Sequence, residues 1–216
     1  MKIFKPLMLI LLMLGTVAVQ AKPLNINQHH FEIRTTQGET EEGFEQDNLE
    51  LYRGDKKLLT HTQRLSTGDC SILTIELGDY EVKNNQVIFY SYWAAGDRQG
   101  LWTFPYGVRK QVYSVDSKGM VKLISAVVYV EDTISNPLET NPDQDYLQFL
   151  TTQPKTQKDK FALNNYIQQM QTRYKARFVH GQERTQLLKE VKSKLASQIA
   201  VETKGWKEDF GQNVRL

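Results

Sequence analysis

Residues 78–131 read GDYEVKNNQVIFYSYWAAGDRQGLWTFPYGVRKQVYSVDSKGMVKLISAVVYVE. Short runs of β-branched and aromatic residues alternate here with residues that favour tight turns. Asn84-Asn85 is a two-residue turn signal, because asparagine tolerates the left-handed backbone conformation, and residues 116–119 are a second one that ends in glycine. The pattern predicts four antiparallel β-strands joined by two tight turns and one long loop.

One of these strands, residues 86–93, has no polar face. Its two sides carry Val87, Phe89 and Trp93 against Ile88, Tyr90 and Tyr92. A strand that is apolar on both sides is usually covered on both sides. We therefore expect this strand near the centre of the sheet.

The chain before residue 78 extends the same pattern. Residues 72–82 alternate between apolar and polar positions, and residues 53–56 predict a hairpin turn with glycine at its tip. Residues 22–46 are mostly polar, so only a short extended run at 31–34 is expected, with an acidic loop at 38–45. Together the pattern predicts an antiparallel β-meander or sandwich of about six strands.

The C-terminal part has helical periodicity. Apolar residues recur at helical spacing over 163–178 and again over 187–199, with Gly181 expected to end the first of the two helices. Such stripes usually face a core. The fold class predicted is therefore α+β, with the antiparallel sheet followed by a C-terminal α-helical hairpin.

The N-terminus is typical of an exported protein. Lys2 and Lys5 precede an apolar run at 7–19, and Val19-Gln20-Ala21 has small residues at the spacing that a signal peptidase accepts. The run has 13 residues, whereas a membrane span needs about 20. We expect a periplasmic or secreted protein without a transmembrane anchor after cleavage. The predicted organisation is a signal peptide at 1–21, an antiparallel β domain at 22–132, a linker at 133–145 and a basic helical region at 146–216.

The charge is divided between two halves. Residues 22–152 hold 12 basic and 19 acidic residues, a net charge of −7, whereas residues 153–216 hold 13 basic and 6 acidic residues, a net charge of +7. A basic half can indicate nucleic acid, but an exported location argues against that partner. We expect the basic half to pack against the acidic half, either of the same chain or of a neighbouring copy of the chain.

Signatures of catalysis are few. The sequence has no Gly-rich phosphate loop, no pair of cysteines and no His-x-x-x-His spacing. His29 and His30 with Glu32 are the one cluster that resembles a metal site, and Cys70 with His61 is a candidate thiol–imidazole combination. Neither pattern is specific, so no catalytic residue, metal ligand or cofactor is assigned.

The binding hypothesis rests on the loop at 94–107, AAGDRQGLWTFPYG, which is long for a hairpin connection. Trp, Tyr and Arg are the residues that dominate binding hot spots, and aromatic rings also stack on sugars. The predicted partner-binding residues are Trp93, Asp97, Arg98, Trp102, Phe104 and Tyr106. The alternative interpretation is that these rings cap the sheet and fill its core.

The function predicted is an exported, non-catalytic binding protein, of an inhibitor or immunity type, that recognises a protein or glycan partner through this loop. Two alternatives stay open. One is an envelope hydrolase whose active site has no recognisable motif. The other is an envelope assembly factor that acts through the basic helical hairpin.

Overall fold

The structure is a computed structural model, and it describes residues 20–40, 43–68, 72–97, 106–131, 168, 171–172 and 174–210. The signal peptide as far as residue 19 and the linker therefore lie outside the described residues. The strands and helices are β1 (Gln20–Ile26), β2 (His29–Glu39), β3 (Glu45–Arg53), β4 (Lys56–Gly68), β5 (Ile72–Lys83), β6 (Gln86–Asp97), β7 (Tyr106–Val115), β8 (Val121–Glu131), β9 (Arg177–Phe178), α3 (Gly181–Lys194) and α4 (Ala196–Phe210).

One sheet contains all nine strands in chain order. β1 to β8 are antiparallel neighbours, and the two-residue β9 pairs with β8 in parallel. The predicted α+β class, with an antiparallel meander and a C-terminal helical pair, is confirmed, but the sheet has nine strands where about six were expected. The additional strands include β1 and β2. Phe31 and Ile33 are the apolar residues of β2 that reach the core, so its sequence gives only a weak strand signal.

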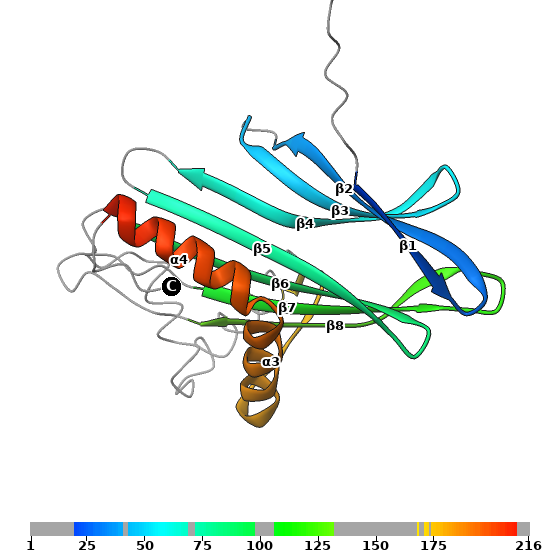
Figure 1. Ribbon diagram of the computed structural model, residues 1–216. Helices are drawn as coiled ribbons and strands as arrows, with labels where there is room; N and C mark the ends of the chain where they lie inside the picture. The colour runs from blue at the N-terminus through cyan, green and yellow to red at the C-terminus, as the bar shows by residue number, and fades with distance from the viewer. Residues whose placement is uncertain are drawn as a thin grey trace, which may run out of the picture.

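The sheet bends sharply at Gly78. β4 and β5 pair from Gly68↔Leu73 as far as Arg64↔Leu77, and there the pairing ends. A Cβ atom at position 78 would lie 1.9 Å from the carbonyl oxygen of Thr62, so only glycine allows the two backbones to approach this closely. β1–β4 and β5–β8 then face one another as two halves (Figure 1).

A core fills the space between the halves. Its buried residues come from both of them: Ile26, Phe31, Ile33, Leu49 and Leu51 on one side, and Val87, Phe89 and Val115 on the other. The face of β6 opposite Val87 and Phe89 is also buried, under the helices. The expectation that residues 86–93 are covered on both sides is therefore confirmed.

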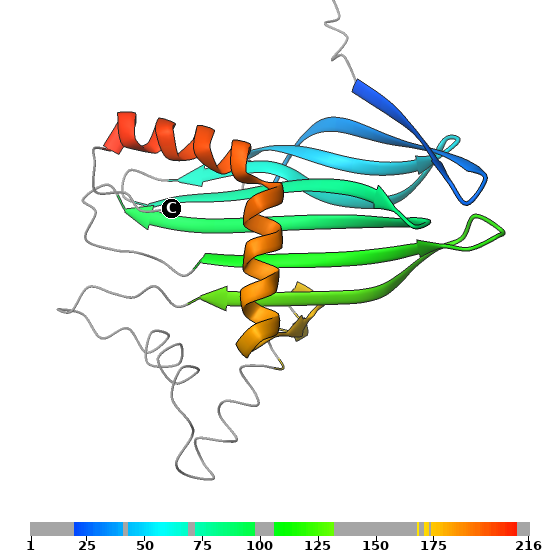
Figure 2. The same cartoon turned by 60° about the horizontal axis from the view of Figure 1, so that its bottom comes forward.

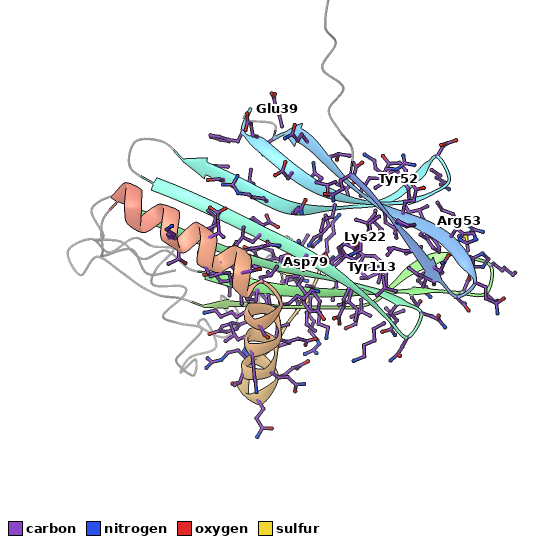
Figure 3. All side chains as sticks on the ribbon, in the orientation of Figure 1. Lys22, Glu39, Tyr52, Arg53, Asp79 and Tyr113 are labelled. Carbon is purple, nitrogen blue, oxygen red and sulfur yellow. The ribbon has the colours of Figure 1, made fainter. Side chains whose placement is uncertain are left out.

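Hairpin turns close one end of the molecule. Asn84 and Asn85 both adopt positive φ angles, 52° and 58°, as the sequence predicts. The Asn27 backbone N–H donates to Asn85 Oδ1 at 3.2 Å, and Arg53 Nη1 donates to the carbonyl oxygens of Lys118 and Gly119, each at 3.0 Å. Arg53 lies at this closed end, whereas Glu39 lies toward the opposite end of β2 (Figure 3). The other ends of β5, β6 and β7 lead into residues 69–71 and 98–105, outside the described part.

The helices cover the outer face of the second half. α3 crosses β6, β7 and β8, and α4 continues along β5 (Figure 2). Leu187, Val191 and Leu195 are buried against apolar side chains of β5–β7. Lys110 of β7 and Glu190 of α3 form an ion pair at 2.5 Å. The basic region therefore docks on the sheet of its own chain.

The helix boundaries differ from those predicted. The stripe at 187–199 was expected in one helix but is divided between α3 and α4 at Leu195. Gly181, with φ 57°, begins α3 instead of ending a helix. Phe178, expected in a helix, lies in β9, where the Val179 N–H donates to the carbonyl oxygen of Val128 at 3.0 Å. The free edge of β8 accounts for this pairing, since its backbone groups need partners.

Candidate functional site: a groove beside α4

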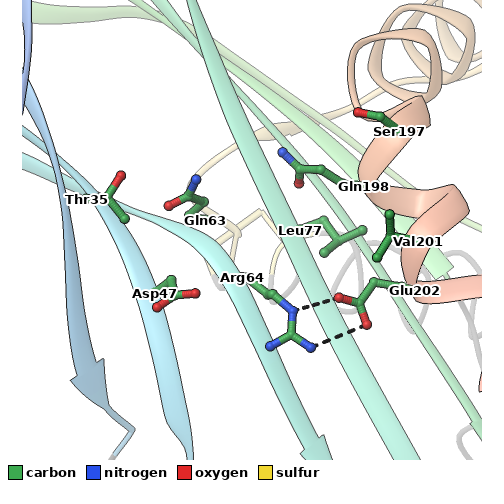
Figure 4. A pocket seen from close by; sticks show the side chains of 9 residues that line it. All are labelled: Thr35, Asp47, Gln63, Arg64, Leu77, Ser197, Gln198, Val201 and Glu202. Atoms are coloured by element: carbon green, nitrogen blue, oxygen red, sulfur yellow. Dashed lines mark hydrogen bonds and ion pairs between the residues drawn. The ribbon is translucent and has the colours of Figure 1, made fainter. Parts of the chain in front are cut away.

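A groove with a volume of about 500 Å³ lies between α4 and strands β2–β5 (Figure 4). This volume falls within the range of small-molecule sites in proteins. Its lining residues come from five elements: Thr35, Asp47, Gln63, Arg64, Leu77, Ser197, Gln198, Val201 and Glu202.

A β-bulge shapes the strand side of this groove. Asp47 pairs with Arg64, and the next residue of β3, Asn48, pairs with Thr62, so Gln63 is an extra residue in β4. A bulge locally redirects side chains. It places Gln63 and Arg64 together on the groove, next to Leu77 of β5.

An ion pair joins the two walls. Arg64 Nε donates to Glu202 Oε1 at 2.6 Å, and Nη2 donates to Oε2 at 3.5 Å. The Glu202 side chain is 12% exposed and the Arg64 side chain is 51% exposed. Gln198 Nε2 also donates to the carbonyl oxygen of Gly78 at 3.4 Å. α4 is thus attached to the sheet by polar contacts at the groove itself.

The groove combines polar groups with two apolar side chains. Leu77 is buried, whereas Val201 is 69% exposed, a high value for an aliphatic residue. Two carboxylates, Asp47 and Glu202, face one guanidinium, Arg64, so the lining carries net negative charge. Amides and hydroxyls supply further donors and acceptors. The lining residues include no histidine or cysteine beside Ser197.

A second polar cluster lies on the opposite, inner face of β5 and β6. His61 Nε2 lies 3.2 Å from both the Ser91 hydroxyl oxygen and the Tyr90 carbonyl oxygen. Arg109 Nη2 donates to Ser91 Oγ at 3.2 Å and lies 3.7 Å from Glu76 Oε1. Burial, reinforced by the positive charge of Arg109, lowers the pKa of His61 to about 4, so the imidazole is neutral at physiological pH. Burial also raises the pKa of Glu76.

Trp93 belongs to this inner face. Its ring stacks on Tyr174, with 4.8 Å between the ring centroids and an interplanar angle of 17°. It also lies directly over Gly107, where a Cβ atom would be 1.9 Å from the indole. Trp93, which the sequence places at the base of the aromatic loop, is thus a partly buried ring that packs against Tyr174 and Gly107.

The other predicted binding residues lie at or beyond the ends of β6 and β7. The backbone of Asp97 pairs with Ile72, and that of Tyr106 pairs with Glu131. Arg98, Trp102 and Phe104 lie outside the described residues, as does Cys70. Sequence reasoning did not identify the groove, because its residues are scattered from position 35 to position 202 and a bulge leaves no clear mark in the sequence.

The two histidines of the cluster that resembles a metal site lie on opposite sides of β2. His29 and His30 are adjacent, so their side chains point to opposite faces. His29 Nε2 lies 2.9 Å from the carbonyl oxygen of Ser117 at the closed end. Across the described ranges, no three His, Cys, Asp or Glu side chains are grouped so that they could hold a metal ion.

A scan against protein-family models finds no match, and searches of the curated proteins and of the solved structures find no significant similarity. Within the part of the chain that the structure describes, no helix is long and apolar enough to cross a membrane. Function must therefore be inferred from the residues themselves.

Proposed function

We propose that the protein is an exported, non-catalytic binding protein that holds a small hydroxylated ligand, such as a sugar unit of a glycan, in the groove beside α4. The ligand is uncharged or carries an amine. The observation that carries the proposal is an open groove of about 500 Å³ in which seven of the nine lining residues have polar side chains, although the lining surface itself is mainly apolar.

The chemistry of the lining suits a sugar. Hydroxyl groups both donate and accept hydrogen bonds, and the groove offers both kinds of partner through Gln63, Gln198 and Ser197. The exposed Val201 gives an apolar surface for the C–H face of a ring. Loss of this exposed apolar surface on binding adds to affinity.

Charge sets the preference among sugars. Arg64 is already engaged by Glu202, and Asp47 adds a further negative charge on the same groove. An anionic ligand therefore meets net repulsion, whereas an ammonium group gains attraction. The protein-partner alternative needs about 800 Å² of surface per partner, and the groove alone has the scale of a small molecule. Because Leu187 and Val191 of α3 are buried against the sheet, the helical-hairpin alternative is left with only the polar face of that helix.

The test uses three ligands that share one ring and differ in charge: glucose, glucosamine and glucuronate. Isothermal titration calorimetry at millimolar ligand is expected to show binding in the order glucosamine, then glucose, then glucuronate. Val201→Trp fills the groove and should abolish binding. Ala200→Trp places the same indole on the neighbouring exposed position, which does not line the groove, and should leave binding unchanged. Equal binding by both variants, or no saturable binding of any of the three ligands, would overturn the proposal.

A further inference from the structure

The inner face carries a guanidinium with unused hydrogen-bonding capacity. Arg109 has five N–H donors. Nη2 donates to Ser91 Oγ at 3.2 Å. Glu76 Oε1, at 3.7 Å, is too far for a direct hydrogen bond. Nε is enclosed and has no hydrogen-bond partner among the described residues. Because Nε is enclosed, the donors that Arg109 can offer to a ligand are those of its Nη groups.

The surroundings hold Arg109 in place. Ser91, which accepts from Arg109, is fully buried and also lies 3.2 Å from His61 Nε2. His61 itself is buried beside Gly78, where it lies 3.1 Å from the position that a Cβ atom would occupy. The side chains that fix the guanidinium are thus themselves held rigidly, which favours binding because little ordering remains to be done.

The cluster can be reached from outside. The side chain of Arg109 is 19% exposed and that of Glu76 is 27% exposed. Glu76 pairs directly across the sheet with Trp93, and Ser91 pairs with Arg109. The carboxylate, the guanidinium and the stacked Trp93–Tyr174 rings therefore lie in adjacent rows of one face. This face is opposite the one that carries Leu77 and the groove, since Glu76 and Leu77 are successive residues of β5.

We propose that Arg109 binds the carboxylate of a small organic acid, separately from the ligand of the groove beside α4, and that Glu76 accepts a hydrogen bond from a hydroxyl or amino group next to that carboxylate. A planar carboxylate matches the guanidinium fork and can accept hydrogen bonds from its two Nη groups. Glu76 is close enough to repel a second negative charge, so a monoanionic carboxylate is favoured over dianionic phosphate. The Trp93–Tyr174 stack bounds the site on its apolar side.

The experiment titrates glycolate, acetate and inorganic phosphate into the purified full chain at constant ionic strength. Binding is followed by calorimetry and by the indole ¹H–¹⁵N signals of the three tryptophans. Glycolate should bind most tightly, acetate less tightly, and phosphate most weakly. Arg109→Gln should weaken glycolate binding about tenfold or more, the range expected for loss of one charge-assisted contact.

The Glu76→Gln variant distinguishes a binding role of Arg109 from a purely structural role. It leaves the guanidinium in place and removes the competing negative charge, so acetate should bind roughly threefold or more tightly than to the wild type. Val201→Trp, in the groove, should change none of these affinities. The proposal is overturned if Arg109→Gln binds glycolate as well as the wild type, if Glu76→Gln weakens acetate binding, or if all three anions and chloride bind alike. Should Arg109→Gln fail to fold, the acetate affinity of Glu76→Gln decides.

Discussion

Acid should destabilise this protein through one buried histidine. His61 is 6% exposed and lies between Phe89, at a ring-centroid distance of 4.7 Å, and the carbonyl oxygen of Tyr90. Burial is the main reason that its pKa falls from 6.5 to about 4, and the positive charge of Arg109 is the second. The folded protein therefore holds this imidazole neutral under conditions in which the unfolded chain protonates it.

The sign and the size of this loss of stability follow from the linkage between proton binding and folding. Because the unfolded state binds the proton more readily, His61 costs nothing above its unfolded pKa of 6.5, and stability falls as the pH drops toward the folded pKa of about 4. Integration over this range gives a loss of about 2 kcal/mol by pH 5 and about 3 kcal/mol when fully developed. Losses of this size are a large fraction of the stability of an ordinary domain.

The assay is urea unfolding followed by tryptophan fluorescence at several pH values from 7.5 to 4.5. His61→Gln is the matched control, because glutamine keeps a polar group near the Tyr90 carbonyl and does not titrate. The difference in unfolding free energy between wild type and variant should shift by about 2 kcal/mol in favour of the variant between pH 7 and pH 5. A difference that stays constant across this range would refute the reasoning, because it would mean that His61 titrates alike in both states.

Two further changes probe the fold and the groove. Gly78→Ala should lower the unfolding free energy by about 1–3 kcal/mol or more, because its Cβ would lie 1.9 Å from the Thr62 carbonyl oxygen and the backbone must move. Gly38→Ala is the control in urea unfolding, since the nearest atom to its Cβ would be a side-chain atom 3.3 Å away. Equal losses in the two variants would contradict the close approach of β4 and β5 at Gly78. A double-mutant cycle of Arg64→Gln and Glu202→Gln should give a coupling energy of about 0.5–1 kcal/mol at low salt and less at high salt, since Arg64 is half exposed. Zero coupling energy at low salt would show that this ion pair does not attach α4 to the sheet.

Turns and the central strand could be predicted because their causes are local. The turn between β5 and β6 needs positive φ angles, which asparagine tolerates, and both Asn84 and Asn85 have them in the structure. The apolar run of β6 follows from its place between the core and the helices. By contrast, β9 forms because the edge of β8 is free, and nothing in residues 177–178 marks them as a strand.

The candidate sites depend on contacts that sequence spacing does not encode. Trp93 was singled out for its place beside the long loop, but its stacking partner, Tyr174, lies far along the chain. The opposite net charges of residues 22–152 and 153–216 predict that the basic half packs against the acidic half. Lys194 with Asp79 follows that polarity. Arg64 with Glu202 and Lys110 with Glu190 reverse it, because local geometry and not net charge selects each pair.

The order of the strands has a consequence for how the molecule comes together. Every strand from β2 to β8 finds its partner in the strand synthesised just before it, so the sheet can grow one hairpin at a time with little loss of loop entropy. α4 is different, because Glu202 must reach Arg64 across 138 positions. We therefore expect α4 to dock after the sheet has formed, and the groove, which needs both walls, to be completed only at that step.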